Sequence, residues 1–367
     1  MSLLAKAAAR AEAARLLARF REHGAEEVEA AILQPADLLL DLYGEDIRAR
    51  AYVTADPSRG EMMLRPDFTV PIALMHMEAG LDPARYAYAG EVFRRQEAGD
   101  ERPSEYLQTG FEIFGGDDPA QADAEVFAAL AGALPDLRLR AGIGDIGLLV
   151  AAVEGLRTTP ARKAALARHI WRPRRFRALL DRFGGRAPPP DGRAALLARA
   201  DPFDGAGPEI GLRSRAEVET RLAALREEAR APLLAGGEID LIDAVLDLAA
   251  PAPQALADLR AIAADLPSIG PAVDRLARRL DALAARGVAV GDLAFEGSFG
   301  RTALEYYDGF VFGLFAPGRP DLPAIASGGR YDALTRVLGR GRAVPAVGGV
   351  IRPELVVALR AQGGGPP

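Results

Sequence analysis

The sequence predicts an α+β fold in which an antiparallel sheet, flanked by helices, is interrupted by a helical insertion. Strand-like runs and helices are mixed over residues 1–145 without the rhythm of βαβ units. Helical periodicity then dominates residues 146–286, and strand-like runs return from residue 288. Because the two outer regions share one mixed pattern, we expect residues 1–145 and 287–367 to form a core domain and residues 146–286 to form a helical subdomain.

The first region begins with a helix and continues with strands. Apolar side chains recur at helical spacing up to about Phe20, which predicts an amphipathic surface helix. Glu12 and Glu22 fall in the same stretch, whereas transit peptides are poor in acidic residues. Strand-like segments follow at 28–33, 50–54 and 61–65.

The most informative segment spans residues 88–115 and reads YAGEVFRRQEAGDERPSEYLQTGFEIFG. Two apolar, strand-like runs flank a polar loop, which predicts a long β-hairpin. Arg94 lies near the loop on one strand, and Gln108 and Glu112 lie on the other. The hairpin therefore carries three candidate site residues.

The middle region is helical and is broken by turn-rich stretches at 184–192 and 201–211. Within it, residues 168–177 read RHIWRPRRFR, a basic run around Trp171. Three interpretations remain open: a surface that stacks on nucleic acid, a solvated helix face, or a contact for an acidic partner. The net charge of the chain argues against the first. The last region has strand-like runs at 288–295, 306–315, 324–327 and 344–350 and a closing helix from Pro353.

Composition excludes several classes of function. The chain has 367 residues, 49% of them hydrophobic, so it can bury a large core. It contains no cysteine, which excludes disulfides and thiolate chemistry, and its three scattered histidines do not have the spacing of a zinc site. A net charge of −6 argues against a broad nucleic-acid surface, and no apolar run reaches the length of a membrane span. We expect a cytoplasmic protein that uses no metal, cofactor, nucleic acid or membrane.

The hairpin resembles motif 2 of class II aminoacyl-tRNA synthetases, in the form found in histidyl-tRNA synthetases. Residues 24–43 (GAEEVEAAILQPADLLLDLY) have the shape of motif 1, with Pro35 where that motif meets the other subunit of a dimer. Residues 64–69 (LRPDFT) are similar to the LRPE.T segment of the family, with Asp67 in the place of its glutamate. Residues 306–312 (YYDGFVF) and 326–332 (ASGGRYD) resemble its two signatures of histidine recognition.

The resemblance implies a class II synthetase-like fold and a histidine pocket. A zwitterionic amino acid with an imidazole ring needs an acceptor for its ammonium, a donor for its carboxylate and partners for both ring nitrogens. By resemblance, Asp67, Thr69 and Gln108 face the ammonium and Arg94 faces the carboxylate. The residues implied for the imidazole and the pocket wall are Glu112, Tyr306, Tyr307, Gly328, Gly329, Arg330 and Tyr331.

The chain departs from the family at its adenylation arginines. The arginine of the family sequence RGLDYY corresponds to Thr302, one residue after Arg301. Because neighbouring side chains of an extended segment point to opposite faces, we expect Arg301 to turn away from the pocket. The arginine that ends motif 3 corresponds to Leu355, and Arg352 lies three residues earlier.

The motif 2 loop carries a third departure, since Ser104 stands where a second arginine would reach phosphate, with Arg102 nearby. Removing one preorganised donor from a developing charge costs about 3–4 kcal/mol. Two such losses would slow adenylate formation by roughly 10⁴-fold or more. We therefore expect histidine binding to be kept and adenylation to be lost.

Residues 356–367 alone follow the motif 3-like segment, so we expect no anticodon-binding domain. A synthetase-like body of this kind is similar to the regulatory subunits of ATP phosphoribosyltransferase, the first enzyme of histidine biosynthesis. The resemblance implies a non-catalytic subunit that the short-form catalytic subunit requires for activity and for feedback inhibition by L-histidine. It also implies that this chain forms a homodimer through motif 1 and a hetero-octamer with the catalytic subunit. Two alternatives stay open: a histidine-activating synthetase paralogue, and an isolated histidine-binding or scaffold protein.

Overall fold

The computed structural model describes residues 3–37, 49–79, 81–96, 102–208, 210–301 and 305–363. Its strands are β1 (Glu26–Glu27), β2 (Leu33–Pro35), β3 (Val53–Asp56), β4 (Gly60–Leu64), β5 (Ala84–Phe93), β6 (Glu105–Phe114), β7 (Arg140–Asp145), β8 (Ala249–Pro251), β9 (Ala294–Glu296), β10 (Phe310–Phe315), β11 (Ala326–Arg330) and β12 (Ala346–Ile351). Its α-helices are α1 (Leu3–Glu22), α3 (Thr69–Ala79), α4 (Pro119–Gly132), α5 (Ile146–Gly155), α6 (Pro160–Arg168), α7 (Pro173–Phe183), α8 (Arg193–Ala198), α9 (Arg215–Arg230), α10 (Gly236–Asp247), α11 (Ala252–Asp265), α12 (Gly270–Ala285), α13 (Asp332–Leu338) and α14 (Pro353–Gly363).

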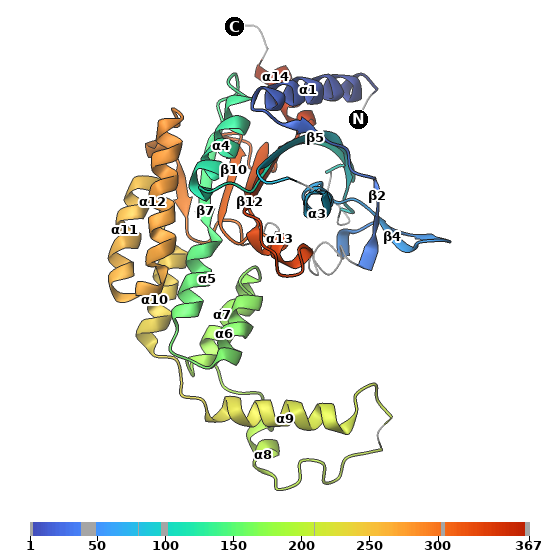
Figure 1. Ribbon diagram of the computed structural model, residues 1–367. Helices are drawn as coiled ribbons and strands as arrows, with labels where there is room; N and C mark the ends of the chain where they lie inside the picture. The colour runs from blue at the N-terminus through green and yellow to red at the C-terminus, as the bar shows by residue number, and fades with distance from the viewer. Residues whose placement is uncertain are drawn as a thin grey trace.

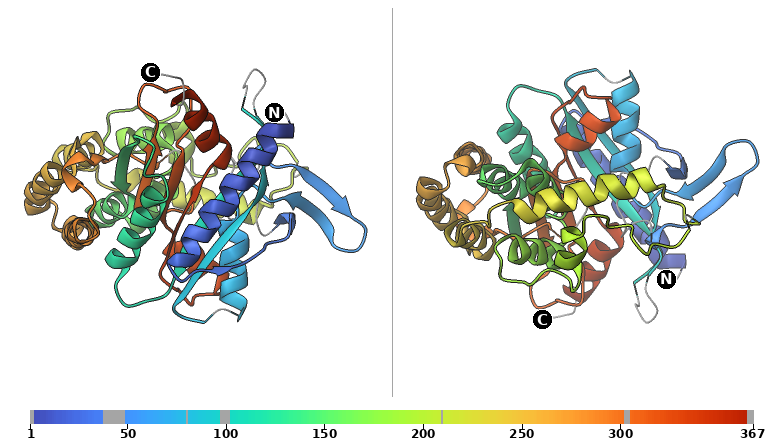
Figure 2. Two further views of the ribbon diagram at one scale, coloured as in Figure 1. Left: turned by 90° about the horizontal axis from the view of Figure 1, so that it is seen from above. Right: turned by 90° about the horizontal axis from the view of Figure 1, so that it is seen from below.

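One large sheet joins both ends of the chain. Within the described residues its strand order is β1-β5-β6-β12-β11-β10-β7-β9-β8, and β2, β4 and β3 form a second, smaller sheet at the side of the molecule (Figures 1 and 2). Neighbours in the large sheet are antiparallel, except for the parallel pairs β1 with β5 and β7 with β9. The predicted α+β class and the shared sheet of the two outer regions are confirmed.

The predicted hairpin is formed by β5 and β6, which pair from Ala84 with Phe114 to Phe93 with Glu105. Alternation along β6 gives the sheet two different faces. Phe111 packs on α1, where its ring stacks on Phe20 with centroids 5.5 Å apart. Glu112 projects from the opposite face and meets Thr69 at the start of α3.

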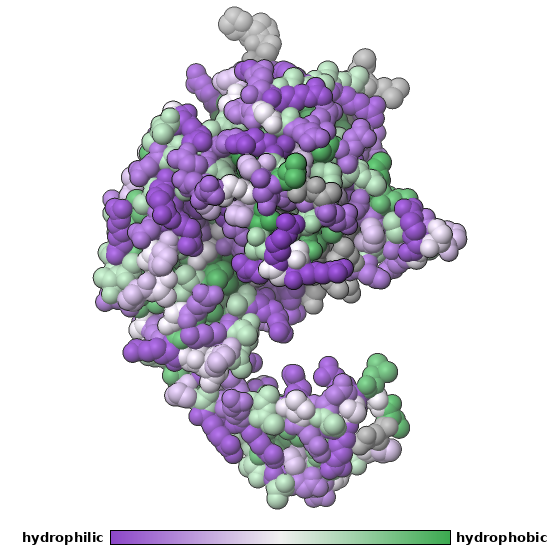
Figure 3. All heavy atoms as spheres, in the orientation of Figure 1, coloured by the Kyte–Doolittle hydropathy of each residue, from purple (hydrophilic) through white to green (hydrophobic). Residues whose placement is uncertain are grey.

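Helices cover the first of these faces in two layers. Helices α1, α4 and α14 pack on the sheet, α12 packs on α4, and α11 packs on α12 (Figure 1). Helices α8 and α9 form a lobe that stands away from the body (Figures 1 and 3). In those two helices only Leu222 is buried. None of the helices within the described ranges combines the length and apolarity that crossing a bilayer requires.

Region 146–286 is helical as expected, except that β8 extends the large sheet by pairing with β9. The division into two domains stays a prediction, because α12 also packs on α4 of the core. Four strand predictions were too long. Residues 28–33 contain only the start of β2, 50–54 hold only the first residues of β3, 288–295 contain a 3₁₀ turn before β9, and 306–315 form a strand only from Phe310.

These segments depart from regular strands because their hydrogen bonds are local or isolated. Val28 donates one backbone bond to Ala87 (2.9 Å) beyond the two-residue β1, and Asp292 closes a turn onto Ala289 (2.9 Å). Apolar composition alone does not reveal such bonds. Pro35 ends β2, whereas positions 38–43 of the motif 1-like segment, the motif 2 loop at 97–101 and Thr302 lie outside the described residues.

Candidate functional site

A cavity of about 810 Å³ lies on the face of the sheet that α1 does not cover. Its walls come from the start of α3, both hairpin strands, the segment before β10, and the strands β11 and β12. Residues predicted from sequence that line it are Asp67, Thr69, Arg94, Gln108, Tyr306, Tyr307 and Gly328. Segments more than 200 residues apart in the chain, such as those of Asp67 and Tyr306, are thus brought together.

A carboxylate and a guanidinium share one wall of this cavity. Asp67 is 3% exposed and accepts a hydrogen bond from the Tyr306 hydroxyl at 3.3 Å. Arg94 places one terminal nitrogen 4.0 Å from the Asp67 carboxylate, and its Nε donates to the carbonyl of Pro66 at 2.8 Å. The wall therefore offers a negative and a positive group to the same small ligand.

Gln108 contributes an acceptor that has no partner in the described part of the chain. Its side chain is 2% exposed, and its Oε1 is fully buried without a hydrogen bond. Buried polar atoms are normally paired, because an unpaired one loses its hydration without compensation. An unpaired amide oxygen in a cavity wall is suited to a ligand that donates a proton, such as an ammonium group.

Glu112 lies behind the cavity wall and organises it. Its carboxylate accepts hydrogen bonds from three hydroxyl groups, those of Thr69 (3.1 Å), Tyr88 (2.7 Å) and Tyr331 (2.5 Å). Complete burial raises the pKa of Glu112 to about 7, although the three hydrogen bonds act in the opposite direction. The neighbouring strand provides space for this carboxylate only because position 348 is glycine, where a Cβ would lie 1.3 Å from Oε2.

Tyr306 and Tyr307 line the aromatic end of the cavity together with Gly328, whereas Tyr331 and Gly329 are buried outside its lining. The rings of Tyr306 and Tyr307 are 4.9 Å apart, and that of Tyr331 is 6.0 Å from Tyr306. Burial raises the pKa of Tyr307, so its hydroxyl stays protonated and can donate a hydrogen bond. Gly329 packs beneath Tyr307, where a Cβ would lie 2.8 Å from the ring, and a Cβ at Gly328 would lie still closer to the backbone of β12.

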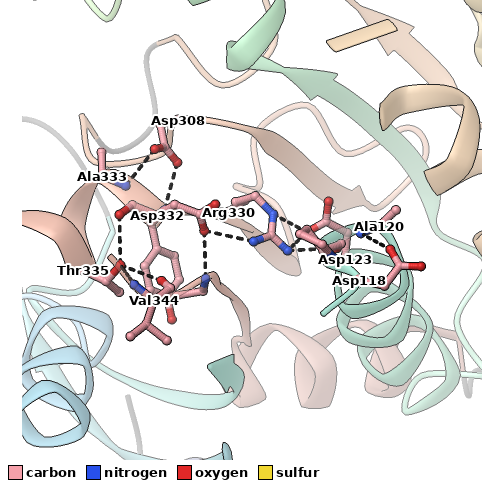
Figure 4. A network of polar contacts seen from close by, with 12 residues as sticks. Asp118, Ala120, Asp123, Asp308, Arg330, Asp332, Ala333, Thr335 and Val344 are labelled. Atoms are coloured by element: carbon pink, nitrogen blue, oxygen red, sulfur yellow. Dashed lines mark hydrogen bonds and ion pairs between the residues drawn. The ribbon is translucent and has the colours of Figure 1, made fainter. Parts of the chain in front are cut away.

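Arg330 is directed elsewhere, as Figure 4 shows. Its guanidinium donates to Asp123 of α4 (2.9 Å), to Asp332 (2.9 Å) and to the carbonyl of Pro119 (2.9 Å). Asp123 also accepts from the buried Arg279 of α12 (2.7 Å), which in turn donates to Asp145 (2.8 Å). Arg330 therefore joins β11 to the helical layers instead of lining the cavity.

Arg301 lines the cavity, which the expectation did not foresee, but its guanidinium is directed toward α7 and lies 5.0 Å from the centroid of the Phe176 ring. Residues 297–301 form a turn, so the alternation of an extended segment does not apply there. The Nε of Arg301 donates to the carbonyl of Ile170 (2.8 Å), while one terminal nitrogen is buried without a partner in the part of the chain that the structure describes. Burial lowers the pKa of Arg301 to about 10.

A second cavity of about 620 Å³ adjoins the first, and Arg50, Arg94 and Arg352 line both. Leu355 presents an apolar side chain to the second cavity, and Arg352 donates to the carbonyl of Ala324 at 2.5 Å. Sequence reasoning missed Arg50, since a single arginine at the start of a strand-like run has no distinguishing spacing.

The histidyl-tRNA synthetase family model matches residues 2–200 and 212–356. Two relatives named ATP phosphoribosyltransferase regulatory subunit are similar over nearly their whole length. The one from Mesorhizobium japonicum is 34% identical, covering 95% of this chain and 97% of its own, and the one from Brucella anthropi is 32% identical, covering 88% and 90%.

Solved structures agree on the fold. A histidine–tRNA ligase subunit from Alicyclobacillus acidocaldarius is 27% identical with a TM-score of 0.60, covering 97% of this chain and 94% of its own. An ATP phosphoribosyltransferase regulatory subunit/histidyl-tRNA synthetase from Bacillus halodurans is 20% identical with a TM-score of 0.67, covering 96% and 79%. The chain has the fold of class II aminoacyl-tRNA synthetases and belongs to the family of ATP phosphoribosyltransferase regulatory subunits.

Proposed function

We propose that this chain is the regulatory, non-catalytic subunit of ATP phosphoribosyltransferase in the first step of L-histidine biosynthesis. The short-form catalytic subunit would require it for activity and for feedback inhibition by histidine. The observation that carries the proposal is the combination of two features in adjoining cavities. The first cavity keeps groups suited to a zwitterionic ligand, while Leu355, which lines the second, stands where the family resemblance places a synthetase arginine.

Histidine fits the cavity group by group. Asp67, Thr69 and the unpaired Oε1 of Gln108 accept from its ammonium, and Arg94 donates to its carboxylate. Tyr307 donates to the imidazole, and Glu112 acts through the hydroxyl groups of Thr69 and Tyr331 that it orients. Asp67 and Arg94 lie 4.0 Å apart, so a zwitterion inserted beside them would meet a complementary pair of charges.

Adenylation activity is lost in this proposal. An apolar Leu355 cannot stabilise the charge that develops on a transferred phosphoryl group, and each missing donor of that kind costs about 3–4 kcal/mol. Arg301 and Arg352 retain positive charge near the cavity, but both use a nitrogen on a backbone carbonyl. The second candidate, a synthetase paralogue that still activates histidine, is favoured by these two arginines and disfavoured by Leu355.

Feedback inhibition requires that histidine binding be linked to the equilibrium between the inhibited and active states of the complex. Histidine inhibits only if it binds the inhibited state of the complex more tightly than the active state, and the nucleotide substrates then weaken histidine binding by the same factor. We propose that histidine shifts the segment 326–332, which begins with β11, and thereby changes the contacts between subunits. The homodimer through motif 1 and the hetero-octamer with the catalytic subunit belong to the same proposal.

The deciding experiment mixes this chain with a short-form ATP phosphoribosyltransferase from the same organism. Formation of phosphoribosyl-ATP from ATP and phosphoribosyl pyrophosphate is followed with and without histidine. We expect this chain to increase the rate and histidine to reverse the increase. If the chain changes neither the rate nor the histidine sensitivity, the proposal fails, and histidine-dependent ATP/pyrophosphate exchange tests the synthetase alternative.

Arg94→Ala tests the pocket within the same assay. Loss of a charged hydrogen bond to the histidine carboxylate should weaken inhibition by about 10- to 100-fold. Arg95→Ala is the matched control, because Arg95 is exposed and lines neither cavity. Full inhibition of the Arg94→Ala complex would show that the cavity is not the feedback site.

A further inference from the structure

The basic segment, residues 168–177, lies against the candidate site. Pro173, the first residue of α7, lines the same cavity as Asp67 and Gln108. Three polar contacts join the segment to the chain between 301 and 307. Trp171 Nε1 donates to the carbonyl of Tyr307 (3.1 Å), Arg301 Nε donates to the carbonyl of Ile170 (2.8 Å), and Arg172 pairs with Glu305 (3.3 Å).

The other side of this segment faces solvent. Phe176, Leu180 and Phe183 are the buried residues of α7, so Arg174 and Arg175 project from its outer face and are exposed. The arginines turned toward the body are neutralised: Arg172 pairs with Glu305, and Arg177 pairs with Asp243 at 2.5 Å. No carboxylate of the described residues pairs with Arg168, Arg174 or Arg175.

The segment therefore concentrates positive charge on a chain whose net charge is −6. This charge also acts on His169. Burial lowers the pKa of His169 most, Arg172, Arg175 and Arg168 lower it further, and Glu305 raises it. Exposed unpaired arginines attract carboxylates and are common in protein interfaces. A net charge of −6 argues against the broad basic surface that nucleic-acid binding requires, so a protein with a local acidic face is favoured as the partner.

We propose that a carboxylate-rich face of the catalytic subunit docks on the basic segment. Through this contact, the segment transmits to that subunit whether a ligand is bound in the cavity. The inference rests on the proposed function and names the contact surface that the function requires. A ligand that moves the backbone of Tyr307 or the side chain of Arg301 also moves the segment, because these groups bond to the Trp171 indole and to the Ile170 carbonyl. The docked partner would thus sense a change in the cavity wall through one short segment.

Charge reversal tests the docking surface. Arg174→Glu/Arg175→Glu is compared with Arg260→Glu/Arg278→Glu, which makes the same change of charge at exposed positions on α11 and α12. Affinity for the purified catalytic subunit is measured by analytical ultracentrifugation at low and high salt. We expect the α7 variant to bind at least about tenfold more weakly and the control variant to bind like wild type.

The outcomes distinguish a failure of the proposed function from a failure of the docking surface alone. A wild-type chain that does not bind the catalytic subunit refutes the proposed function itself. Wild-type affinity in both reversal variants refutes only the docking surface, because the wild-type chain still binds the catalytic subunit. Retention of single-stranded RNA by wild type, abolished in the α7 variant without any change in binding of the catalytic subunit, would identify the segment as a nucleic-acid surface instead.

Trp171→Phe tests the transmission of occupancy. The substitution keeps an aromatic ring and removes the donor to Tyr307. Histidine changes the affinity of the wild-type chain for the catalytic subunit by a factor that linkage sets equal to the change in histidine affinity. In the variant we expect this factor to move toward one. An unchanged factor would overturn the role of this hydrogen bond.

Discussion

Glu112 couples the structure of the site to pH. Its pKa is raised from 4.5 to about 7 by complete burial, so the folded state favours the protonated form. A raised carboxyl pKa contributes stability that is fully present below pH 4.5 and is lost as the pH rises to about 7, an amount of about 3 kcal/mol. Relative to Glu112→Gln, wild type should therefore lose about that much unfolding free energy between these pH values. Urea unfolding of both proteins across the range measures it, and a constant difference would contradict the raised pKa.

A substitution of Gln108 should affect histidine binding without lowering the unfolding free energy. Gln108→Leu removes a buried oxygen that has no partner in the described part of the chain, so we expect the unfolding free energy to stay the same or to rise by about 1 kcal/mol. Histidine should bind about tenfold or more weakly, because its ammonium loses an acceptor. Calorimetric titration and thermal unfolding give the two values. Unchanged affinity in a stable variant would remove Gln108 from the site.

At the scale of elements, the close approach of β6 and β12 depends on a glycine. A Cβ at position 348 would lie 1.3 Å from Glu112 Oε2, and the carboxylate cannot withdraw without breaking its bonds to Tyr88 and Tyr331. Gly348→Ala should therefore lower the unfolding free energy by about 1–3 kcal/mol and weaken histidine binding. Gly237→Ala in α10 is the control, since its Cβ meets nothing within 4 Å, and it should be neutral or stabilising. Equal stability of the two variants would contradict this account.

The same scale explains what could be predicted from sequence. The hairpin was predictable because its two apolar runs and polar loop are local features, and most residues implied by the family resemblance do line the cavity. Arg301 and Arg330 were not, because partners distant in sequence decide their directions: Ile170 lies 131 residues from the first, and Asp123 lies 207 residues from the second. A turn before position 301 and a carboxylate on α4 leave no periodic signal.

At the scale of the molecule, buried ion pairs hold the sheet to its helical layers. Asp123 of α4 bonds both Arg330 of β11 and Arg279 of α12, and all three side chains are buried. Asp123→Ala leaves two buried guanidinium groups short of a counter-charge, so we expect the unfolding free energy to fall by about 3–5 kcal/mol. Glu219→Ala, which breaks the exposed pair with Arg215, should cost only about 0.3–0.5 kcal/mol.

Trp171, the only tryptophan, reports whether region 146–286 and the core unfold together in one transition. Its ring belongs to the region 146–286, yet it donates to Tyr307 of the core, and the Arg279 pairs tie α12 to the same core. We therefore expect tryptophan fluorescence and far-ultraviolet circular dichroism to report one coincident urea transition in wild type. In Asp123→Ala the midpoint should fall while the two signals stay coincident, because Trp171 remains bonded to the core. Separate transitions in wild type would show that region 146–286 unfolds on its own and that the ion pairs do not unite the molecule.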